Sequence, residues 1–427
     1  MVSFTRVAIA VDAGPDRRDV ELVIRRFLSP GTFQEEWCHA CGRDRGAHKF
    51  TPCQSRGLSH HQVSLGENAA RCARIDQLCL SSLESGESTA RGGFAELSRI
   101  EYNAPQARVG AGWMRGLFLH YGDQMAHWNG VFPAITTQML EDGSLNVEGT
   151  AKHAEALIES GVTGIIFLGS LGENQTLAPN EKRSMIEAMV KVVSGRVHVL
   201  SGVAESSTQS AIDYIRYVEK VGGDGVMLMP PMLYRGAADE SLRFFQQVTR
   251  NTGLPIMVYN NPIAYFNDIT PSMFERLAEE PRLVAIKESS GDTRRITDLR
   301  IAVGDRYALF TGVDNLILEA SILGIDGWVA GSGIAFPKEN QYFWELTRLG
   351  RWEEAREMYR WFTPLLHLDV HTKFVQYIKL MVQECGLGRE WVRAPRLSLT
   401  GEERERILKV IHQGIQTRPN LRPLSKA

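Results

Sequence analysis

Two residues with reactive side chains stand at the ends of apolar runs near the middle of the chain. Tyr259 ends the run at 255–259, and Lys287 follows the run at 283–286. A lysine in an apolar strand is rare, because a buried ammonium group must find a partner or lose its charge. A neutral amine attacks carbonyl and imine carbons, so the sequence predicts Schiff-base chemistry at Lys287.

A third feature is the turn that follows the apolar run at 164–168. Residues 169–174 read Gly-Ser-Leu-Gly-Glu-Asn, and the two glycines let backbone N–H groups approach a ligand closely. A helix that begins after such a turn favours a negatively charged guest. The turn therefore predicts a carboxylate site.

Each feature also has an ordinary explanation that needs no active site. On this explanation the Gly-x-x-Gly sequence serves only as a tight turn after a strand. Tyr259 then presents its hydroxyl to water at a strand end, and Lys287 pairs with a neighbouring acid. Glu173 and Glu288 are expected to cap a helix or form ion pairs rather than to transfer protons. The joint occurrence of the turn, the tyrosine and the lysine at three strand ends favours a functional site.

Apolar runs of strand character alternate with amphipathic helical patterns from residue 128 onward. Strands are expected at 131–136, 164–168, 198–203, 225–229, 255–259, 283–287, 307–311 and 327–330. Helices are expected at 146–160, 180–193, 207–221, 239–252, 271–279, 294–303, 315–323 and 338–349. Eight strand–helix units of even length predict an α/β fold, the (β/α)8 TIM barrel, whose active site lies at the carboxyl ends of the strands. A doubly wound open sheet is the alternative.

The barrel is assigned to residues 126–350. Three further helical patterns, at 351–366, 370–385 and 401–417, predict a C-terminal helical bundle over 351–418, and 419–427 form a tail. Residues 1–125 lack sustained apolar periodicity. They are interpreted as a disordered N-terminal extension or as an upstream stretch translated from an early start, with Met114 or Met125 as the first residue used.

Five of the six cysteines lie within the first 80 residues of the chain. Cys38, Cys41, His48 and Cys53 have the spacing C-x2-C-x6-H-x4-C, and these residue types can hold zinc tetrahedrally. The spacing matches no familiar zinc finger, so no metal site is predicted. Since only Cys385 lies in the rest of the chain, no disulfide framework is expected there.

The composition is that of an ordinary soluble enzyme. Of the 427 residues 43% are hydrophobic and 23% charged, and 48 basic residues against 50 acidic ones leave a formal net charge of −2. This balance creates no global field for nucleic acid or an anionic membrane. No apolar run reaches the length of about 18 residues typical of a transmembrane helix, and no secretory signal precedes Asp12. A cytoplasmic location without nucleic-acid or membrane partners is predicted.

Three motifs in order along the chain resemble those of the dihydrodipicolinate synthase and N-acetylneuraminate lyase family. They are Gly-Ser-Leu-Gly-Glu at 169–173, Tyr-Asn-Asn-Pro at 259–262 and Ile-Lys-Glu-Ser-Ser-Gly-Asp at 286–292. The resemblance covers residues 128–417. It implies a homo-oligomer, a dimer or a tetramer, and a reaction that needs no metal or organic cofactor.

The resemblance also implies roles for single residues. Lys287 forms an imine with a 2-oxo acid, Tyr259 shuttles protons, and Ser170 belongs to the catalytic group. The substrate-binding residues that it implies are Gly169, Ser170 and Leu171 at the carboxylate turn, and Val329 and Gly331 at the end of strand eight.

The departures from the family pattern bear on the reaction. Dihydrodipicolinate synthases carry an arginine two residues after the motif proline, a relay tyrosine in the strand-four loop and a second threonine in the carboxylate turn. Here these positions are Ala264, Met232 and Leu171. They argue against lysine biosynthesis. Because Leu171 cannot pass a proton, a relay from Tyr259 must use Ser170, water or the substrate, and Tyr234 is a possible substitute.

Several stretches resemble the 1-pyrroline-4-hydroxy-2-carboxylate deaminases of hydroxyproline catabolism. They lie at 130–138, 200–205, 260–265 and 367–369. The resemblance implies conversion of this cyclic 2-imino acid into 2-oxoglutarate semialdehyde and ammonia. Other open possibilities are a hydratase-aldolase, a sugar-acid dehydratase or aldolase, a non-catalytic ligand-binding barrel, and a nucleic-acid-binding module built on the Cys38 to Cys53 cluster.

Overall fold

The computed structural model describes residues 7–13, 20–29, 32–39, 128–231 and 234–424. The chain divides into two compact units, Met1–Gln106 and Ala107–Ala427.

The first unit contains a small antiparallel sheet that the sequence does not predict. Its strands β1 (Val7–Ala13), β2 (Val20–Ser29) and β3 (Thr32–His39) pair in the order β1-β2-β3. Cys38 of the cysteine–histidine cluster lies on β3, whereas Cys41, His48 and Cys53 lie outside the described residues. The interpretation of residues 1–125 and the question of a metal there stay predictions.

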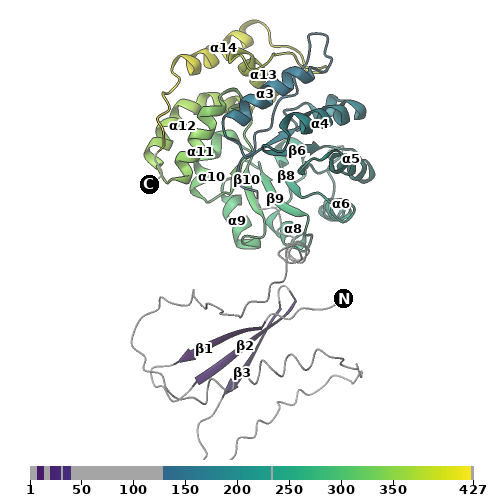
Figure 1. Cartoon of the computed structure of the whole chain (residues 1–427), viewed down its shortest axis with the longest axis vertical. Helices are drawn as coiled ribbons and strands as arrows, with labels where there is room; N and C mark the ends of the chain where they lie inside the picture. The colour runs from purple at the N-terminus through teal and green to yellow at the C-terminus, as the bar shows by residue number, and fades with distance from the viewer. Residues whose placement is uncertain (1–6, 14–19, 30–31, 40–127, 232–233, 425–427) are drawn as a thin grey trace, which may run out of the picture. The chain divides into compact units, whose positions relative to one another are not determined.

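The second unit is built around eight parallel strands (Figure 1). They are β4 (Gly130–Val131), β5 (Gly164–Phe167), β6 (His198–Val203), β7 (Gly225–Leu228), β8 (Ile256–Asn260), β9 (Leu283–Glu288), β10 (Ala308–Thr311) and β11 (Gly327–Trp328). The sheet order is β4-β11-β10-β9-β8-β7-β6-β5, and a parallel bridge between Ala134 and Ile166 joins its two edges. The predicted (β/α)8 barrel is confirmed.

Helices follow these strands along the chain, and the longer ones surround the barrel on the outside (Figure 1). They are α3 (Val147–Glu159), α4 (Pro179–Val193), α5 (Thr208–Val221), α6 (Ala238–Arg250), α7 (Pro262–Tyr265), α8 (Pro271–Arg276), α9 (Arg294–Val303), α10 (Ile317–Ile322) and α11 (Pro337–Arg348). Short 3-10 turns are η1 (Asn174–Thr176), η2 (Asp314–Leu316), η3 (Ser332–Ala335) and η4 (His367–Asp369). The one-turn helix α7 is absent from the sequence-based expectation.

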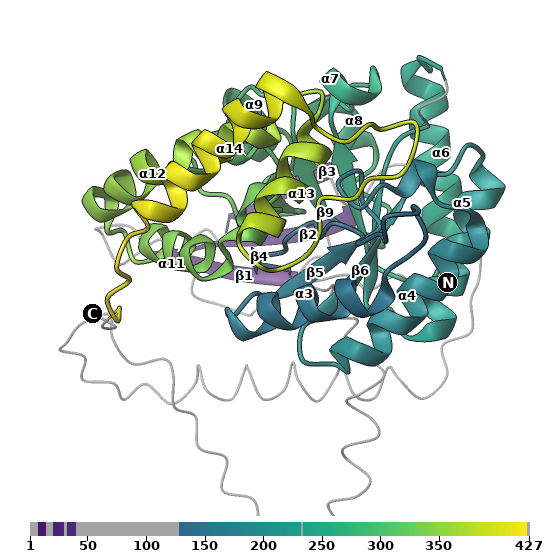
Figure 2. The same ribbon diagram turned by 90° about the horizontal axis from the view of Figure 1, so that it is seen from above.

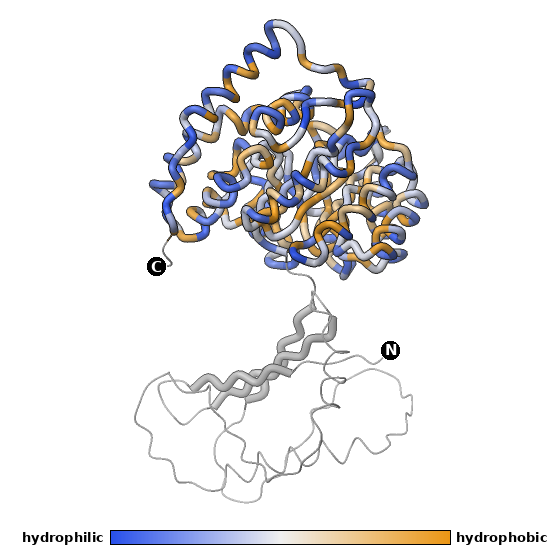
Figure 3. The backbone as a smooth tube through the Cα atoms, turned by 45° about the horizontal axis from the view of Figure 1, so that its top comes forward, coloured by the Kyte–Doolittle hydropathy of each residue, from blue (hydrophilic) through white to orange (hydrophobic). Residues whose placement is uncertain are grey.

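Alternate residues of strands such as β8 pack on opposite faces of the barrel wall, as the two-residue period of a strand requires. On β8, Met257 and Tyr259 belong to the cluster inside the barrel, and Val258 belongs to the cluster between strands and helices. Figure 3 shows the hydrophobic strands at the centre and helices of mixed hydropathy around them. Lys287 lies two residues after Ala285, a member of the inner cluster, so its side chain is directed into the barrel.

Aromatic rings fill the amino end of the barrel. The rings of Phe132 and Phe310 meet edge to face with centroids 5.3 Å apart. Glycine begins the strands beside them because a Cβ at Gly164 would lie 2.4 Å from the Phe132 ring, and one at Gly327 would lie 2.1 Å from the Phe310 ring. The barrel interior is therefore closely packed around these rings.

The C-terminal helices α12 (Trp352–Leu366), α13 (Phe374–Glu384) and α14 (Gly401–Gln416) pack against one another (Figure 2). The helix predicted at 370–385 begins only at Phe374, because the chain first forms the turn η4. Lys379 of α13 and Glu173 after β5 form an ion pair with both side chains fully buried. This pair anchors the bundle to the barrel. None of the helices in the described ranges is long and apolar enough to cross a membrane.

Candidate active site

Lys287 and Tyr259 lie side by side on the inner wall of the barrel. They are register partners on the neighbouring strands β9 and β8. The Lys287 Nζ atom lies 3.7 Å from the centroid of the Tyr259 ring, and each residue is only 6% exposed. The face of a phenol ring stabilises a positive charge at this distance. The pair can therefore hold a cationic nitrogen, such as a protonated imine, inside the barrel.

One cavity of about 1420 Å³ opens above this pair. Its lining includes six of the seven residues that the sequence singles out, namely Ser170, Leu171, Tyr259, Lys287, Val329 and Gly331. Gly169 is not part of the lining, and a Cβ at this position would lie 3.3 Å from Met227 Cε. The rest of the wall includes Ala264 of α7 and residues 369–374 and 395–398 of the C-terminal region.

The turn after β5 is held rigidly by side chains around it. Asn174 Nδ2 donates to the Leu168 carbonyl at 2.7 Å, and Thr137 Oγ1 donates to the Gly172 carbonyl at 2.7 Å. In the described part of the chain, the backbone N–H groups of Ser170 and Leu171 donate to no protein acceptor. Two N–H groups in a fixed turn on the cavity wall suit a carboxylate.

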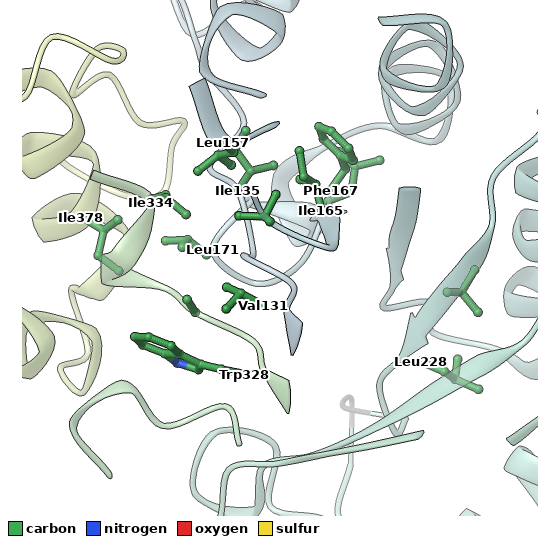
Figure 4. Close-up of a cluster of buried hydrophobic side chains, with 14 of the residues drawn as sticks. Val131, Ile135, Leu157, Ile165, Phe167, Leu171, Leu228, Trp328, Ile334 and Ile378 are labelled. Carbon is green, nitrogen blue, oxygen red and sulfur yellow. The ribbon is translucent and has the colours of Figure 1, made fainter. Parts of the chain in front are cut away.

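The Leu171 side chain is part of the core. It is 4% exposed and lies near Ile334 and Val131 in the buried cluster of Figure 4. A hydrophobic side chain at this position fits the packing, so Leu171 offers a ligand its backbone N–H and no hydroxyl.

Tyr265 is a polar group of the site that sequence reasoning missed. Its hydroxyl makes a hydrogen bond with Ser170 Oγ, and its ring packs edge to face against Tyr259 with centroids 5.4 Å apart. Asn261 Nδ2 donates to Tyr259 Oη at 3.2 Å. Tyr259, Tyr265 and Ser170 thus bring three hydroxyl groups together at the cavity. Tyr234, the substitute relay considered from the sequence, is 55% exposed and does not line the cavity.

Burial raises the pKa of the Tyr265 phenol well above its usual value. Charge on Tyr259 raises it further, and the hydrogen bond with Ser170 acts in the opposite direction. Tyr265 therefore stays protonated at neutral pH and can pass a proton only as it receives another. No sequence signal indicates this role, because Tyr265 ends the one-turn helix α7, which the sequence does not predict.

The two acidic residues of the sequence motifs have structural partners, as expected. Glu288 follows Lys287 on β9, is absent from the lining of the large cavity, and accepts from Asn260 Nδ2 at 2.9 Å and from the Ser290 N–H at 2.6 Å. Burial raises the pKa of Glu288, and these hydrogen bonds oppose the shift. Glu173 pairs with Lys379 and accepts the Arg393 N–H at 3.0 Å. Both side chains hold the framework of the site.

Asp369 is a second residue that sequence reasoning did not assign to the site. It lies on η4 and lines the cavity together with Lys287. The sequence singles out the stretch at 367–369, but a turn between two helical patterns gives no sign of which strand end it approaches. In the described ranges, no three His, Cys, Asp or Glu side chains are arranged to hold a metal ion.

Comparison with known proteins agrees with this geometry. The profile of the Dihydrodipicolinate synthetase family matches residues 127–414. The 4-hydroxy-tetrahydrodipicolinate synthase of Desulforamulus reducens is 30% identical over 283 residues, which are 66% of this chain and 96% of that protein. The enzyme of the same name from Methanococcus vannielii is 34% identical over 240 residues, 56% of this chain and 82% of that protein.

Solved structures show the same barrel. A dihydrodipicolinate synthase from Bacillus anthracis is 28% identical with a TM-score of 0.65, covering 68% of this chain and 99% of that one. The 4-hydroxy-tetrahydrodipicolinate synthase of Methylacidiphilum fumariolicum is 26% identical with a TM-score of 0.65, covering 68% of this chain and 96% of that one. With a paired lysine and tyrosine in the barrel mouth and a family profile matched over residues 127–414, the chain belongs to the dihydrodipicolinate synthetase family and is an enzyme of its Schiff-base lyase type.

Proposed function

We propose that the protein converts 1-pyrroline-4-hydroxy-2-carboxylate into 2-oxoglutarate semialdehyde and ammonia, with Lys287 as the Schiff-base residue. The observation that carries the proposal is the position of the Lys287 amine, 3.7 Å from the Tyr259 ring inside a cavity that has a carboxylate-binding turn on its wall.

The reaction begins at C2 of the cyclic imine. The lone pair of Lys287 Nζ attacks C2, the bond from C2 to the ring nitrogen breaks, and the ring nitrogen leaves as a free amine at C5. Lys287 then carries the protonated imine. Its positive charge lies over the face of Tyr259, which favours this intermediate.

The substrate carboxylate is assigned to the turn after β5. The free N–H groups of Ser170 and Leu171 and the Ser170 hydroxyl offer it donors on the cavity wall. Val329 and Gly331 bound the space on the side of β11. A carboxylate fixed there orients C2 toward Lys287, which reduces the entropy lost on reaching the transition state.

The protonated imine acts as an electron sink and makes a C3 proton acidic. Tyr259 accepts this proton as it passes its own phenolic proton to the hydroxyl groups of Tyr265 and Ser170. Loss of the C4 hydroxyl from the resulting enamine, tautomerisation and hydrolysis of both imines release ammonia and the semialdehyde. One water is lost and two are added, so the net reaction consumes one water.

The substrate choice rests on the distal part of the cavity. Ala264 lines the cavity at the position where dihydrodipicolinate synthases carry the arginine that grips the carboxylate of a second substrate. The methyl group of alanine cannot bind a carboxylate. The relatives named above are synthases, so condensation of pyruvate with aspartate semialdehyde is the competing activity to be tested.

The test is a substrate panel on wild type, Lys287→Ala and the control Lys152→Ala, whose side chain is 75% exposed. Wild type and Lys152→Ala are expected to release ammonia from 1-pyrroline-4-hydroxy-2-carboxylate, and Lys287→Ala is expected to release none. Borohydride reduction with pyruvate, followed by mass analysis of the Lys287 peptide, checks the imine separately from turnover.

The other possibilities have distinct outcomes. Imine trapping with aspartate-semialdehyde condensation identifies a synthase, and trapping with aldehyde release from a 4-hydroxy-2-oxo acid identifies the aldolase branch. An unmodified Lys287 in wild type leaves a non-catalytic binding barrel. A 2-oxo or cyclic 2-imino acid is the partner that we propose, and sedimentation of the full chain tests the proposed dimer or tetramer.

A further inference from the structure

A pair of carboxyl groups lies on the side of β10 and β11, and one of them, Asp369, lines the cavity. Asp314 is on η2, directly after β10, and Asp369 is on η4 in the C-terminal region. Both crowd around Gly331, where a Cβ would lie 2.4 Å from Asp369 Oδ1 and 3.4 Å from Asp314 Oδ2. Glycine at 331 therefore leaves room for the two carboxyl groups.

Asp314 is fully buried and surrounded by hydrogen-bond donors. Its Oδ1 accepts from Trp328 Nε1 at 3.0 Å and from the Gly331 N–H at 3.0 Å, and its Oδ2 accepts from the Ser332 N–H at 2.5 Å. Three N–H donors stabilise a carboxylate. Burial raises the pKa of Asp314, and these hydrogen bonds oppose the shift, so Asp314 is the member of the pair with donors for a negative charge.

Asp369 has different surroundings. It faces the cavity, and the groups that act on it electrostatically are Asp314 and Lys287. Burial raises the pKa of Asp369 well above its usual range, the charge of Asp314 raises it further, and Lys287 and the backbone of Asp314 lower it. Two neighbouring carboxyl groups cannot both ionise easily, and the three N–H donors around Asp314 favour its carboxylate form, which leaves Asp369 as the better place for a proton.

This carboxyl group is separate from the hydroxyl groups described above. Tyr259 and Tyr265 come from β8 and α7, and Asp369 lies beside the ends of β10 and β11. In the sheet, β9 with Lys287 stands between β8 and β10. The imine nitrogen therefore has hydroxyl groups on one side and a protonated carboxyl group on the other.

We propose that Asp369 is the proton donor to the hydroxyl group that leaves C4 of the substrate imine. The inference rests on the proposed function, in which Tyr259 removes the C3 proton. It assigns a proton donor to the next step, the loss of the C4 hydroxyl. In this step the enamine electrons re-form the imine, the C4–O bond breaks with its electron pair on oxygen, and the Asp369 proton moves to that oxygen, so that water leaves. Asp369 becomes a carboxylate and is protonated again from water.

The experiment compares wild type with Asp369→Asn and Asp369→Glu. The control is Asp305→Asn, a fully exposed carboxyl group that pairs with Arg300 on the surface. Three readouts are ammonia release from 1-pyrroline-4-hydroxy-2-carboxylate, borohydride trapping of pyruvate, and exchange of the pyruvate methyl protons with deuterated water. Trapping and exchange need Lys287 and Tyr259 but no leaving hydroxyl.

Asp369→Asn is expected to lower kcat for ammonia release by about 10²-fold or more, the usual contribution of a general acid, and to keep trapping and exchange. Asp369→Glu is expected to recover part of the loss, and Asp305→Asn to behave as wild type. Full ammonia release by Asp369→Asn overturns the inference. So does an equal loss of trapping, exchange and ammonia release, which indicates a structural role.

A wild type that releases no ammonia contradicts the proposed function, and the state of Asp369 is then judged by infrared spectroscopy. A carbonyl band of a protonated carboxyl group at neutral pH that disappears in Asp369→Asn supports a proton donor at this place. A spectrum in which no such band is lost on substitution overturns the inference independently of the substrate.

Discussion

Lys287 and Tyr259 are register partners on adjacent parallel strands, and the lysine Nζ lies 3.7 Å from the centre of the tyrosine ring. The β-sheet fixes this relationship, since both side chains point inward from neighbouring strands of the barrel. Gly312, just after β10, completes the arrangement, because its missing side chain leaves the space that the Lys287 side chain occupies.

Gly312→Ala is expected to displace the reactive amine. The new Cβ would lie 2.2 Å from Lys287 Cε and 2.3 Å from Ser289 Oγ, so the lysine side chain must move. A shift of about 1 Å in a reacting group costs on the order of 10²-fold in rate. Borohydride trapping with pyruvate measures the effect. Gly236→Ala, whose Cβ meets nothing closer than 3.6 Å, is the control, and equal trapping rates for both variants would contradict the prediction.

Tyr265→Phe is expected to slow turnover by about 10²-fold while leaving imine formation intact, because it removes the hydroxyl group between Tyr259 and Ser170. Tyr234→Phe, an exposed tyrosine outside the cavity lining, is expected to keep wild-type activity. Comparison of kcat with the yield of borohydride trapping checks the split. A Tyr265→Phe enzyme with full kcat would rule out the relay.

Glu173→Gln is expected to destabilise the fold by about 3–5 kcal/mol, because it leaves the fully buried Lys379 ammonium without its counter-charge. Lys379→Met alone is expected to lower the free energy of unfolding by an amount of the same order. The double variant should lose less than the sum of the two, since neither charge is left unpaired. Urea unfolding of the four proteins provides this cycle, and additive losses would show that the pair is not coupled.

His153 is expected to make stability fall between pH 7 and pH 5. Burial lowers the pKa of this histidine to about 4, whereas its reference value is 6.5, and its Nε2 lies 2.9 Å from the Ile334 carbonyl oxygen. The unfolded chain takes up the proton below pH 6.5 and the folded chain only near pH 4. Stability is thus complete above pH 6.5 and decreases toward pH 4, by about 2 kcal/mol between pH 7 and pH 5.

His153→Gln is expected to remove this part of the pH dependence. The surface variant His412→Gln is the control and should retain it. The measurement is the free energy of unfolding in urea at pH 7 and pH 5 for each protein. An unchanged difference between the two pH values in His153→Gln would assign the effect to other groups.

The sequence by itself determined the barrel and its reactive pair. Apolar runs separated by helical patterns locate strands such as His198–Val203 and helices such as Arg294–Val303 at their observed bounds. These are local signals, because a strand buried on both faces reads as a continuous apolar run and a helix buried on one face repeats its apolar residues with the helical period. Tyr259 and Lys287 were identifiable for the same reason, since a polar side chain at the end of a buried strand interrupts the apolar pattern.

Only the tertiary structure decided which distant residues complete the cavity. Asp369 follows Lys287 by 82 positions in the sequence, and no periodicity indicates that η4 returns to the end of β11. Glu173 and Lys379 are 206 residues apart, yet they form one buried pair. Such contacts depend on how closed sheets and packed helices fill space. A local pattern of residue types records which face is buried but carries no information about which partner covers it.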